Sequence, residues 1–360
     1  MKDYLLKTFK NILNQMEQIP QDSEWHAEGN VKIHTIMVLE ELFKDTEYKS
    51  LPEDKKEILA YAAFFHDLGK IYTTKEENGR IISPNHSKVG AQEFRTIFFD
   101  IISFEKRENI VNLIRYHGYP IHYYEKPDFK IVEISSILDT QLLYLLAKAD
   151  INGRISSGKE EYLLNIDYFK EKAIEYNCYG RSLKFSSSTA RNHFFKTGVK
   201  YEPFIKKRST VTMLVGLPGV GKDFYIKKYE LKNVISLDQL RIDMKVKRGN
   251  KKKEGQMLQE AKFQIKKYLA NNEDFVFNAT NLIKSNRLKW ISLFKEYGAI
   301  VNIVYLEKSL SKIFIQNRKR KDSISEWIIS NYLKFLEIPT IEEADSIKYI
   351  VEKRKNNFIC

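Results

Sequence analysis

The sequence predicts a protein of two unlike parts: a mostly helical part up to about residue 150 and an α/β part with a parallel sheet from residue 211 onward. Three observations lead to this fold class. In the first part, apolar residues recur at helical steps. From Val211, short β-branched runs alternate with longer helical segments, the pattern of a parallel sheet with crossover helices. At 360 residues, the chain is too long for one ordinary core.

Four segments of the first part are expected to form helices. Residues 33–43 carry apolar side chains at mixed three- and four-residue steps, and residues 56–67 are apolar nearly all round, which is typical of a buried helix. Residues 110–116 and 134–149 repeat the pattern. Glycine or proline separates these segments, at Gly79, Pro84, Gly118 and Pro120. The N-terminal domain is therefore expected to be all-α.

The middle of the chain has the pattern of a connector. Residues 154–178 have the spacing of one or two amphipathic helices, and the serine-rich stretch at 186–189 and the segment around Pro203 are typical of a linker. Beyond it, four apolar runs are expected to be buried parallel strands, at residues 211–215, 234–237, 275–277 and 300–306. The basic stretch at 245–253 is expected to be a loop or a helix surface.

These patterns divide the chain into three. The expected domains are an N-terminal helical domain (1–154), a helical connector and linker (155–209) and a C-terminal α/β domain (210–360).

Composition narrows the class of partner. The net charge of +13 and pI near 9.3 favour a polyanion such as nucleic acid, although a solvated lysine-rich surface explains the charge equally well. No apolar run reaches the length of a membrane span, so we expect no membrane association. The N-terminal residues lack the pattern of a signal peptide, and the two cysteines form no disulfide framework; both point to the cytoplasm.

A set of imidazoles and carboxylates in the first part could hold a divalent metal. The adjacent pair His66-Asp67 closes a buried apolar helix, where an ordinary surface role is hard to justify. His34 opens another helix and Asp150 ends a fourth. Lys70, four residues past His66, is near enough to face a phosphate, and Arg115 is a second, weaker candidate for that role. A single histidine of this kind is more often structural, so the set carries the argument.

The order His … His-Asp … Asp resembles the HD phosphohydrolase superfamily. The matching segments are GNVKIHTIMVL at 29–39, FFHDLGK at 64–70 and LLAKADINGR at 145–154. Members with extra histidines use them for a second metal, and His86 and His117 match those positions. The resemblance implies a metal-dependent phosphohydrolase with the ligands His34, His66, Asp67, His86, His117 and Asp150. It leaves Mn²⁺, Fe²⁺, Co²⁺, Ni²⁺ and Zn²⁺ open as the metal.

The second part opens on a phosphate-binding loop. The expected strand at 211–215 leads into Gly216-Leu-Pro-Gly219-Val220-Gly221-Lys222, after which a helix should begin. In that setting, backbone N–H groups surround the phosphates of ATP or another NTP, and Lys222 bridges the β- and γ-phosphates.

One position departs from the usual phosphate loop. Asp223 stands where a serine or threonine usually meets Mg²⁺, and Asn278 ends the third expected strand, where many such proteins carry aspartate. Our hypothesis is that Asp223 supplies the metal-directed carboxylate that Asn278 cannot.

Further candidates lie at the carboxyl edge of the expected sheet and on a later helix. Asp238 follows a strand and could accept a proton from an attacking hydroxyl, and Arg241 shares its face if a helix begins at once. A helix-capping aspartate beside a surface arginine is the competing interpretation. Arg318 and Arg320 could close over a transferring phosphoryl group as a helical lid, or could belong to a basic surface stripe.

These motifs resemble the P-loop polynucleotide 5′-kinase group over residues 210–345. The matching segments are GLPGVGKD, SLDQLR at 236–241, FVFNATN at 275–281 with Arg287, and QNRKRK. The resemblance implies that Asp238 is the general base, that Arg241 contacts the phosphate beside the acceptor hydroxyl, and that a lid arginine, Arg318 or Arg320, contacts the ATP phosphates.

Taken whole, the chain resembles the bacterial HD-Pnk type of end-healing enzyme. That resemblance implies a 2′,3′-phosphoesterase joined to a 5′-hydroxyl kinase, acting on RNA or DNA strand ends. No ligase motif is evident, so joining would need a separate ligase. Two alternatives stay open: a small-molecule or nucleoside kinase fused to a nucleotide phosphohydrolase, and a non-catalytic sensor with decayed sites.

Overall fold

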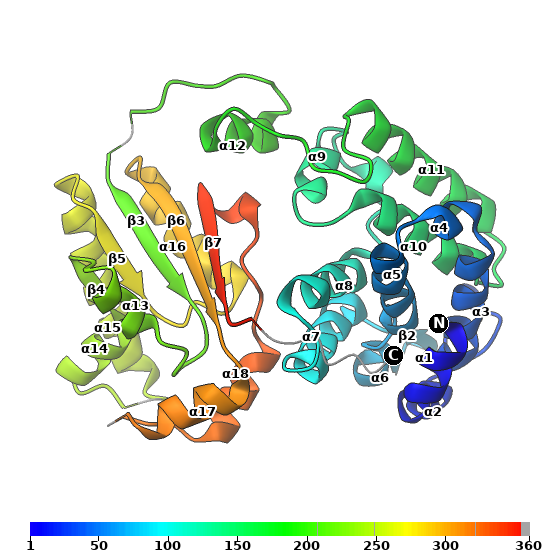
Figure 1. Ribbon diagram of the computed structural model, residues 1–360, viewed down its shortest axis with the longest axis horizontal. Coiled ribbons are helices and arrows are strands. Elements are labelled where there is room, and N and C mark those ends of the chain that lie inside the picture. The colour runs from blue at the N-terminus through cyan, green and yellow to red at the C-terminus, as the bar shows by residue number, and fades with distance from the viewer. Residues whose placement is uncertain (207, 248, 321, 354–360) are drawn as a thin grey trace. The chain divides into compact units, whose positions relative to one another are not determined.

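The computed structural model describes residues 1–206, 208–247, 249–320 and 322–353 (Figure 1). The described chain forms two compact units, residues 1–184 and 185–353. In the described part of the chain, no helix combines the length and the apolar character that crossing a bilayer requires.

The first unit is helical. Its helices are α1 (Lys2–Thr8), α2 (Lys10–Glu17), α3 (Val31–Lys44), α4 (Thr46–Ser50), α5 (Glu53–Phe65), α6 (Lys70–Thr73), α7 (His86–Phe98), α8 (Phe104–Tyr116), α9 (Lys130–Ser135), α10 (Thr140–Asn152) and α11 (Lys159–Glu175), with a 3₁₀ turn at Tyr123–Glu125. The central helix is α5, in which every side chain from Ile58 to Phe65 is buried, as its all-round apolar sequence predicts. It packs against α3, α8 and α10, so the core surrounds the element that ends at His66.

One expectation for this unit needs correction, and one expected break has a form that was not anticipated. The segment expected as one helix at 134–149 is divided between α9 and α10, because Asp139 caps a new helix by accepting hydrogen bonds from the Gln141 and Leu142 amides. The expected break at Gly79 is the turn of a short antiparallel hairpin, β1 (Lys75–Glu77) with β2 (Arg80–Ile82). Both Asn78 and Gly79 have positive φ there, as a tight two-residue hairpin turn requires.

The second unit is an α/β fold with a five-stranded, wholly parallel sheet of order β4-β5-β3-β6-β7. The strands are β3 (Thr210–Val215), β4 (Val234–Ser236), β5 (Phe275–Asn278), β6 (Ile300–Glu307) and β7 (Ser346–Val351). The first four coincide with the expected strands, apart from Leu237, which begins a helix. The edge strand β7 was not anticipated, because SIKYIV is half exposed and lacks a continuous apolar run.

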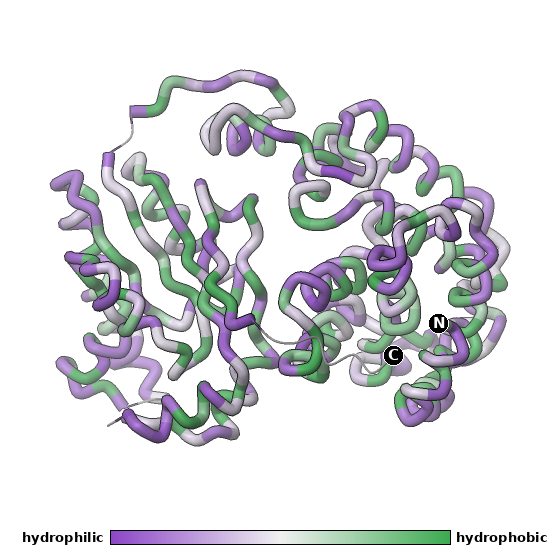
Figure 2. The backbone as a smooth tube through the Cα atoms, viewed as in Figure 1, coloured by the Kyte–Doolittle hydropathy of each residue, from purple (hydrophilic) through white to green (hydrophobic). Residues whose placement is uncertain are grey.

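Helices cover this sheet and continue past the carboxyl end of β6 (Figure 1). They are α12 (Ser188–Thr197), α13 (Lys222–Lys228), α14 (Leu237–Asp243), α15 (Lys251–Ala270), α16 (Lys284–Glu296), α17 (Leu310–Arg318) and α18 (Glu326–Lys334), with a 3₁₀ turn at Ile341–Glu343. Hydrophobic residues follow the strands, whereas hydrophilic residues dominate the outer helices (Figure 2). The basic stretch at 245–253 lies at the start of α15.

The residues between the two expected domains are shared by the two units. Helix α11 packs against α9 and α10 in the first unit. Helix α12 belongs to the second, where Arg191 donates to the carbonyl oxygens of Ala344 and Asp345 at 2.7 and 3.1 Å. The three-part division at 154 and 209 stays a prediction.

Candidate functional site

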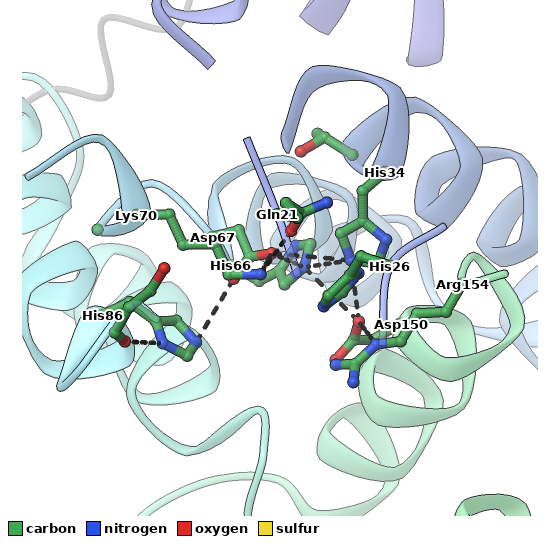
Figure 3. Close-up of polar contacts among 12 residues, drawn as sticks. Gln21, His26, His34, His66, Asp67, Lys70, His86, Asp150 and Arg154 are labelled. Atoms are coloured by element: carbon green, nitrogen blue, oxygen red, sulfur yellow. Dashed lines mark hydrogen bonds and ion pairs between the residues drawn. The ribbon is translucent and has the colours of Figure 1, made fainter. Parts of the chain in front are cut away.

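The first unit gathers the predicted histidines and aspartates from five elements into one cluster, in which only His86 is not fully buried. Figure 3 labels all of these residues except His117. Three sets of ligand atoms each lie within 4.8 Å of one another: His34, His66 and Asp150; Asp67, His86 and His117; and His26, Glu28 and His34. All six residues predicted as metal ligands belong to the first two sets.

Local structure explains this convergence. His66 and His117 cap the C-terminal ends of α5 and α8, and His86 opens α7. Gly69 makes the approach of α7 possible, since a Cβ there would lie 2.0 Å from the His86 carbonyl oxygen. A side chain at that position would push His86 away from Asp67.

The proton positions of the imidazoles follow from their backbone contacts. The Nδ1 atoms of His66, His86 and His117 lie 2.8–2.9 Å from the carbonyl oxygens of Ala63, Ser83 and Ile114. A carbonyl can only accept, so Nδ1 carries the proton and Nε2 carries the lone pair. These Nε2 atoms point at one another in pairs, 3.3 Å from His66 to His34 and 3.4 Å from His86 to His117.

That donor set fits divalent metal ions. Facing lone pairs repel unless a cation lies between them, and imidazole with carboxylate is a usual transition-metal set. The Asp67 carboxylate lies between the two pairs, with Oδ2 3.3 Å from His66 Nε2 and Oδ1 3.5 Å from His86 Nε2. The geometry therefore suits two neighbouring ions with Asp67 between them.

The electrostatics keep the two aspartates ionised. Burial acts to raise the pKa of Asp67, but the Lys70 ammonium and the neighbouring histidines hold it well below its usual range. Burial likewise opposes ionisation of Asp150, but Arg154 and His34 hold its pKa well below the usual range. Burial lowers the pKa of His117 to about 3, which keeps its imidazole neutral and able to bind a metal.

Lys70 lies inside the cluster. Its Nζ is 2.8 Å from Asp67 Oδ2 and donates to Gln21 Oε1 at 2.7 Å. Arg115 lies elsewhere, exposed and 3.5 Å from the Ser87 hydroxyl. Lys70 thus contacts the candidate metal centre, whereas Arg115 does not.

Three contributors were not predicted as site residues. Glu28 Oε1 lies 2.8 Å from His26 Nδ1 and 2.9 Å from His34 Nδ1, and Oε2 accepts from the Ile155 amide. Burial opposes ionisation of Glu28, but the contacts from His26 and His34 hold its pKa below its usual range. Arg154 donates to both oxygens of Asp150, at 3.1 and 2.6 Å. The WHAEGN segment and the four-residue spacing of Asp150 and Arg154 were the available signals.

The second unit forms the phosphate loop between β3 and α13. Gly216, Gly219 and Gly221 have φ of +153°, +80° and +107°, in the range that favours glycine. A Cβ at Gly216 would lie 2.7 Å from the Leu306 carbonyl oxygen. Val220, between two of these glycines, is buried. The backbone thus has the open, curved path that surrounding a phosphate requires.

Lys222 crosses the loop. Its Nζ donates to the carbonyl oxygens of Gly216 and Leu217 at 2.9 and 3.1 Å, and the side chain is buried. Burial lowers its pKa to about 8, against the opposing effect of Asp238 and Asp223.

Magnesium has a candidate site beside Lys222. Asn278 Nδ2 donates to Asp223 Oδ1 at 2.8 Å, and Asn278 Oδ1 is buried without a hydrogen-bond partner among the described residues. A carboxylate and an orphaned amide oxygen are hard oxygen donors, so the pair fits Mg²⁺ held with a nucleotide.

A small pocket of about 110 Å³ adjoins the loop. It contains Asp238, Arg241 and Arg320 beside Pro218 of the loop. Arg241 Nη1 lies 2.9 Å from Asp238 Oδ1, while its buried Nε has no hydrogen-bond partner in the described chain. Ser236 caps α14, so the helix begins at once and places Asp238 and Arg241 on one face, as predicted.

The two candidate lid arginines differ in their surroundings. Arg320 lines the pocket with Asp238. Arg318 is exposed at the end of α17, and its Nε donates to Glu326 Oε1 at 2.8 Å. Arg287 is fully buried, pairs with Glu343 and donates to the Asn281 and Leu282 carbonyls, so it supports the turn after β5.

Comparison with known proteins finds a different family match in each of the two units. Residues 32–143 match the HD domain family, and residues 211–330 match an AAA domain family. The chain is 25% identical over 207 residues to a multifunctional CCA protein of Mannheimia succiniciproducens, covering 54% of this chain and 45% of that protein. It is 42% identical over 59 residues to a multifunctional CCA protein of Shewanella frigidimarina, 16% of this chain and 12% of that one.

The chain spans less than half the length of these curated relatives. The chain thus joins a helical region that matches the HD domain to an α/β region that matches the AAA domain and contains a P-loop.

Proposed function

We propose that this protein heals broken nucleic-acid strands by phosphorylating 5′-hydroxyl ends and removing 3′-phosphate or 2′,3′-cyclic phosphate ends. One observation carries the proposal: Asp238 and Arg241 share a pocket with the phosphate loop, beside Arg320. That arrangement supports the proposal, because it groups a carboxylate and two cations beside the loop that would bind the nucleotide phosphates.

The kinase reaction assigns a task to each of these residues. Asp238 accepts the proton as the 5′ oxygen attacks the γ-phosphorus of the NTP, and the bond from that phosphorus to the β-phosphate bridging oxygen breaks. Lys222 and the loop amides neutralise charge on the leaving diphosphate. Arg241, with its unpaired Nε, binds the phosphate next to the acceptor hydroxyl, and Arg320 contacts the transferring group.

Magnesium in this reaction is assigned to the pair of Asp223 and Asn278. When bound with the nucleotide, Mg²⁺ neutralises charge on the β- and γ-phosphates. The Asp223 carboxylate takes the role usually filled by a hydroxyl after the lysine, and Asn278 orients it through their 2.8 Å hydrogen bond.

In the HD domain, two divalent ions are assigned to the buried cluster. His34, His66 and Asp150 would hold one ion, and Asp67, His86 and His117 would hold the other. Ions bound there would activate a water and polarise a phosphoryl oxygen. Lys70 offers its ammonium to a phosphate oxygen, and Arg154 holds Asp150 in place.

The two activities make chemical sense in one chain. Many cleavages leave a 5′-hydroxyl and a 3′- or cyclic phosphate, and a conventional ligase joins neither. Clearing one end and phosphorylating the other produces ends that a separate ligase can seal. We assign the protein to the cytoplasm and the ligase to a partner. The relatives' description as multifunctional supports a chain with more than one activity.

The test uses one oligonucleotide with a 5′-hydroxyl and a 3′-phosphate, incubated with ATP, Mg²⁺ and Mn²⁺. Both ends are followed in the wild type, Lys222→Ala and Asp67→Ala. Each variant is expected to lose one end reaction and keep the other, so each serves as the folding control for its partner. A parallel reaction without ATP should keep only the 3′ reaction.

The alternative function, a small-molecule or nucleoside kinase, predicts the opposite result in this test. If the wild type leaves both ends untouched but transfers phosphate to a free nucleoside, the substrate is a small molecule and the end-healing proposal fails. If neither RNA nor DNA nor nucleoside is modified, the catalytic proposal fails altogether.

A further inference from the structure

We propose that a groove between α15, α16 and α18 binds the single-stranded nucleic acid that leads away from the 5′-hydroxyl being phosphorylated. The groove has a volume of about 970 Å³. It lies entirely within the second unit. The inference rests on the proposed kinase function and names the class of its acceptor: a strand rather than a free nucleoside.

The groove is continuous with the candidate kinase pocket. Leu237, Ala279, Thr280 and Tyr332 line both the groove and the small pocket that contains Asp238 and Arg241. A ligand whose first hydroxyl meets Asp238 can therefore extend into the groove without leaving the protein surface. A free nucleoside would end inside the small pocket, whose volume is about 110 Å³.

The charge of the groove suits a phosphodiester backbone. Lys262 and Lys266 enter it from α15 and Lys289 from α16, against one carboxylate, Glu296, among the described lining residues. All three lysines are exposed, and none forms an ion pair within the described part of the chain. Unpaired ammonium groups along a concave surface are what a strand of phosphates requires.

Aromatic side chains lie among these cations. Trp290 packs on Phe277 with ring centroids 4.9 Å apart, which fixes it as part of the wall. Tyr332 and Phe335 contribute from the α18 segment, and Phe335 is 55% exposed. Trp290 and Tyr332 are half-buried, so Phe335 offers the most open ring. Rings beside lysines give bases a stacking surface that does not depend on base identity. The combination is typical of single-strand binding without sequence preference.

The lysines are aligned by the helix itself. Gly255, Leu258, Gln259, Lys262 and Lys266 line the groove, and their three- and four-residue spacing places them on one face of α15. From Gly255 to Lys266 that face is about 16 Å long, at 1.5 Å per residue. Gly255 lacks a side chain and has open space around its Cβ position, which keeps one end of the groove wide.

The same helix provides a matched control. Lys253 and Lys267 lie on α15 but do not line the groove. Lys262→Glu/Lys266→Glu and Lys253→Glu/Lys267→Glu therefore make the same change of charge on the same element. Only the first pair alters the proposed strand path.

The experiment measures 5′-phosphorylation by the full-length protein across an acceptor series, from a nucleoside 3′-phosphate through a dinucleotide to a long single strand. In the wild type, KM should fall as the acceptor lengthens and then level off once the strand leaves the groove. Lys262→Glu/Lys266→Glu should raise KM for the long strand by at least about tenfold and leave KM for the shortest acceptor and for ATP unchanged. Lys253→Glu/Lys267→Glu should behave as the wild type.

Salt dependence and stacking give independent readouts. Each lysine that meets a phosphate should contribute roughly 0.7 to the slope of log Kd against log salt for a single strand, and that part should be lost in the groove variant. Phe335→Ala should weaken strand binding by about tenfold with little change in the salt slope.

The outcomes separate the two proposals. Kinase activity on oligonucleotides that is equally affected, or equally unaffected, by the two double variants overturns the groove assignment and leaves the kinase function standing. Absence of kinase activity on every 5′-hydroxyl acceptor overturns the function itself. If the groove variant changes only self-association, the groove binds a second copy of this chain and the strand assignment is wrong.

Discussion

Asn278 and Asp223 form a 2.8 Å hydrogen bond between the end of a central strand and the helix that follows the phosphate loop. The amide occupies the place where an aspartate is usual, and the carboxylate the place where a hydroxyl is usual. The bond brings both side chains to one point beside the buried Lys222 and leaves Asn278 Oδ1 as a buried, unpaired acceptor in the described chain. The two departures from the usual motif are thus in direct contact with each other.

The first prediction follows from the unusual residues at positions 223 and 278. Asp223→Ala should lower kinase turnover at limiting Mg²⁺ by roughly 10- to 100-fold or more, since it removes a metal-directed carboxylate. The double variant Asp223→Thr/Asn278→Asp restores the usual arrangement and should recover more activity than either single change. The measurement is turnover against Mg²⁺ concentration. Full ATP turnover in Asp223→Ala at all Mg²⁺ concentrations would contradict the assignment of Asp223 to Mg²⁺ binding.

A second prediction separates the two candidate lid arginines. Arg320 lines the pocket of Asp238, whereas Arg318 pairs with Glu326 on the surface. Arg320→Ala should reduce kinase kcat on the order of 10³-fold, as expected for an arginine that stabilises a transferring phosphoryl group. Arg318→Ala is the matched control and should change kcat little, because an exposed ion pair contributes little. Equal losses in the two variants would assign the lid role to both.

The third prediction concerns Glu28 as a positioning residue. Its carboxylate lies 2.9 Å from His34 Nδ1 and leaves Nε2 of that ring for the metal. Glu28→Gln should weaken metal binding in the HD domain by roughly 10- to 100-fold, as loss of such partners usually does. Calorimetric titration with Mn²⁺ measures the affinity, and turnover at saturating Mn²⁺ should largely recover.

Glu24→Gln is the control for this change. Glu24 is an exposed residue of the same segment, paired with Arg80. The Glu24→Gln variant should bind Mn²⁺ as the wild type does. Unaltered Mn²⁺ affinity in Glu28→Gln would show that Glu28 only supports the fold.

A fourth prediction follows from the facing imidazole nitrogens. Because His66 Nε2 and His34 Nε2 lie 3.3 Å apart, a bound cation should stabilise the first unit. At about 100 times its Kd, a metal that binds only the folded chain adds roughly 2.7 kcal/mol to the free energy of unfolding. Thermal unfolding with and without Mn²⁺, Co²⁺, Ni²⁺, Fe²⁺ or Zn²⁺ measures the effect, and Asp67→Asn should remove most of it. No stabilisation by any of the five would contradict the metal assignment.

The fifth prediction uses pH. Burial raises the pKa of the Cys178 thiol to about 11. The folded chain therefore retains this proton between about pH 9, the usual pKa, and pH 11, where the unfolded chain loses it. Stability from this group is present below pH 9 and is lost as pH rises through 11. Alkylation of a Cys360→Ser variant at pH 9 should be slow when folded and fast in denaturant, since the thiolate reacts. Fast alkylation of the folded chain would be the contrary result.

Hydrophobic periodicity and short motifs in the sequence predicted most of the helices and strands and the position of the phosphate loop. The apolar segment at 56–67 became α5, the short runs at 211–215 and 300–306 became parallel strands, and Gly216 to Lys222 became a loop between strand and helix. These features depend on neighbours along the chain, which a sequence pattern records directly. The division of residues 130–152 into two helices was missed, although Asp139 as a helix cap was its signal.

Only the tertiary structure determined which side chains contact each other in the candidate sites. Glu28 beside His34, Asn278 beside Asp223, and Arg320 rather than Arg318 in the pocket of Asp238 all join residues brought together by packing. Spacing along the chain says nothing about such pairs when several elements separate them. The groove lysines show both effects. Helical spacing aligns Lys262 with Lys266, but only the fold places their face opposite residues of α16 and of the α18 segment as one wall of a groove. A sequence therefore predicts which chemistry a chain carries, and packing decides which side chains perform it together.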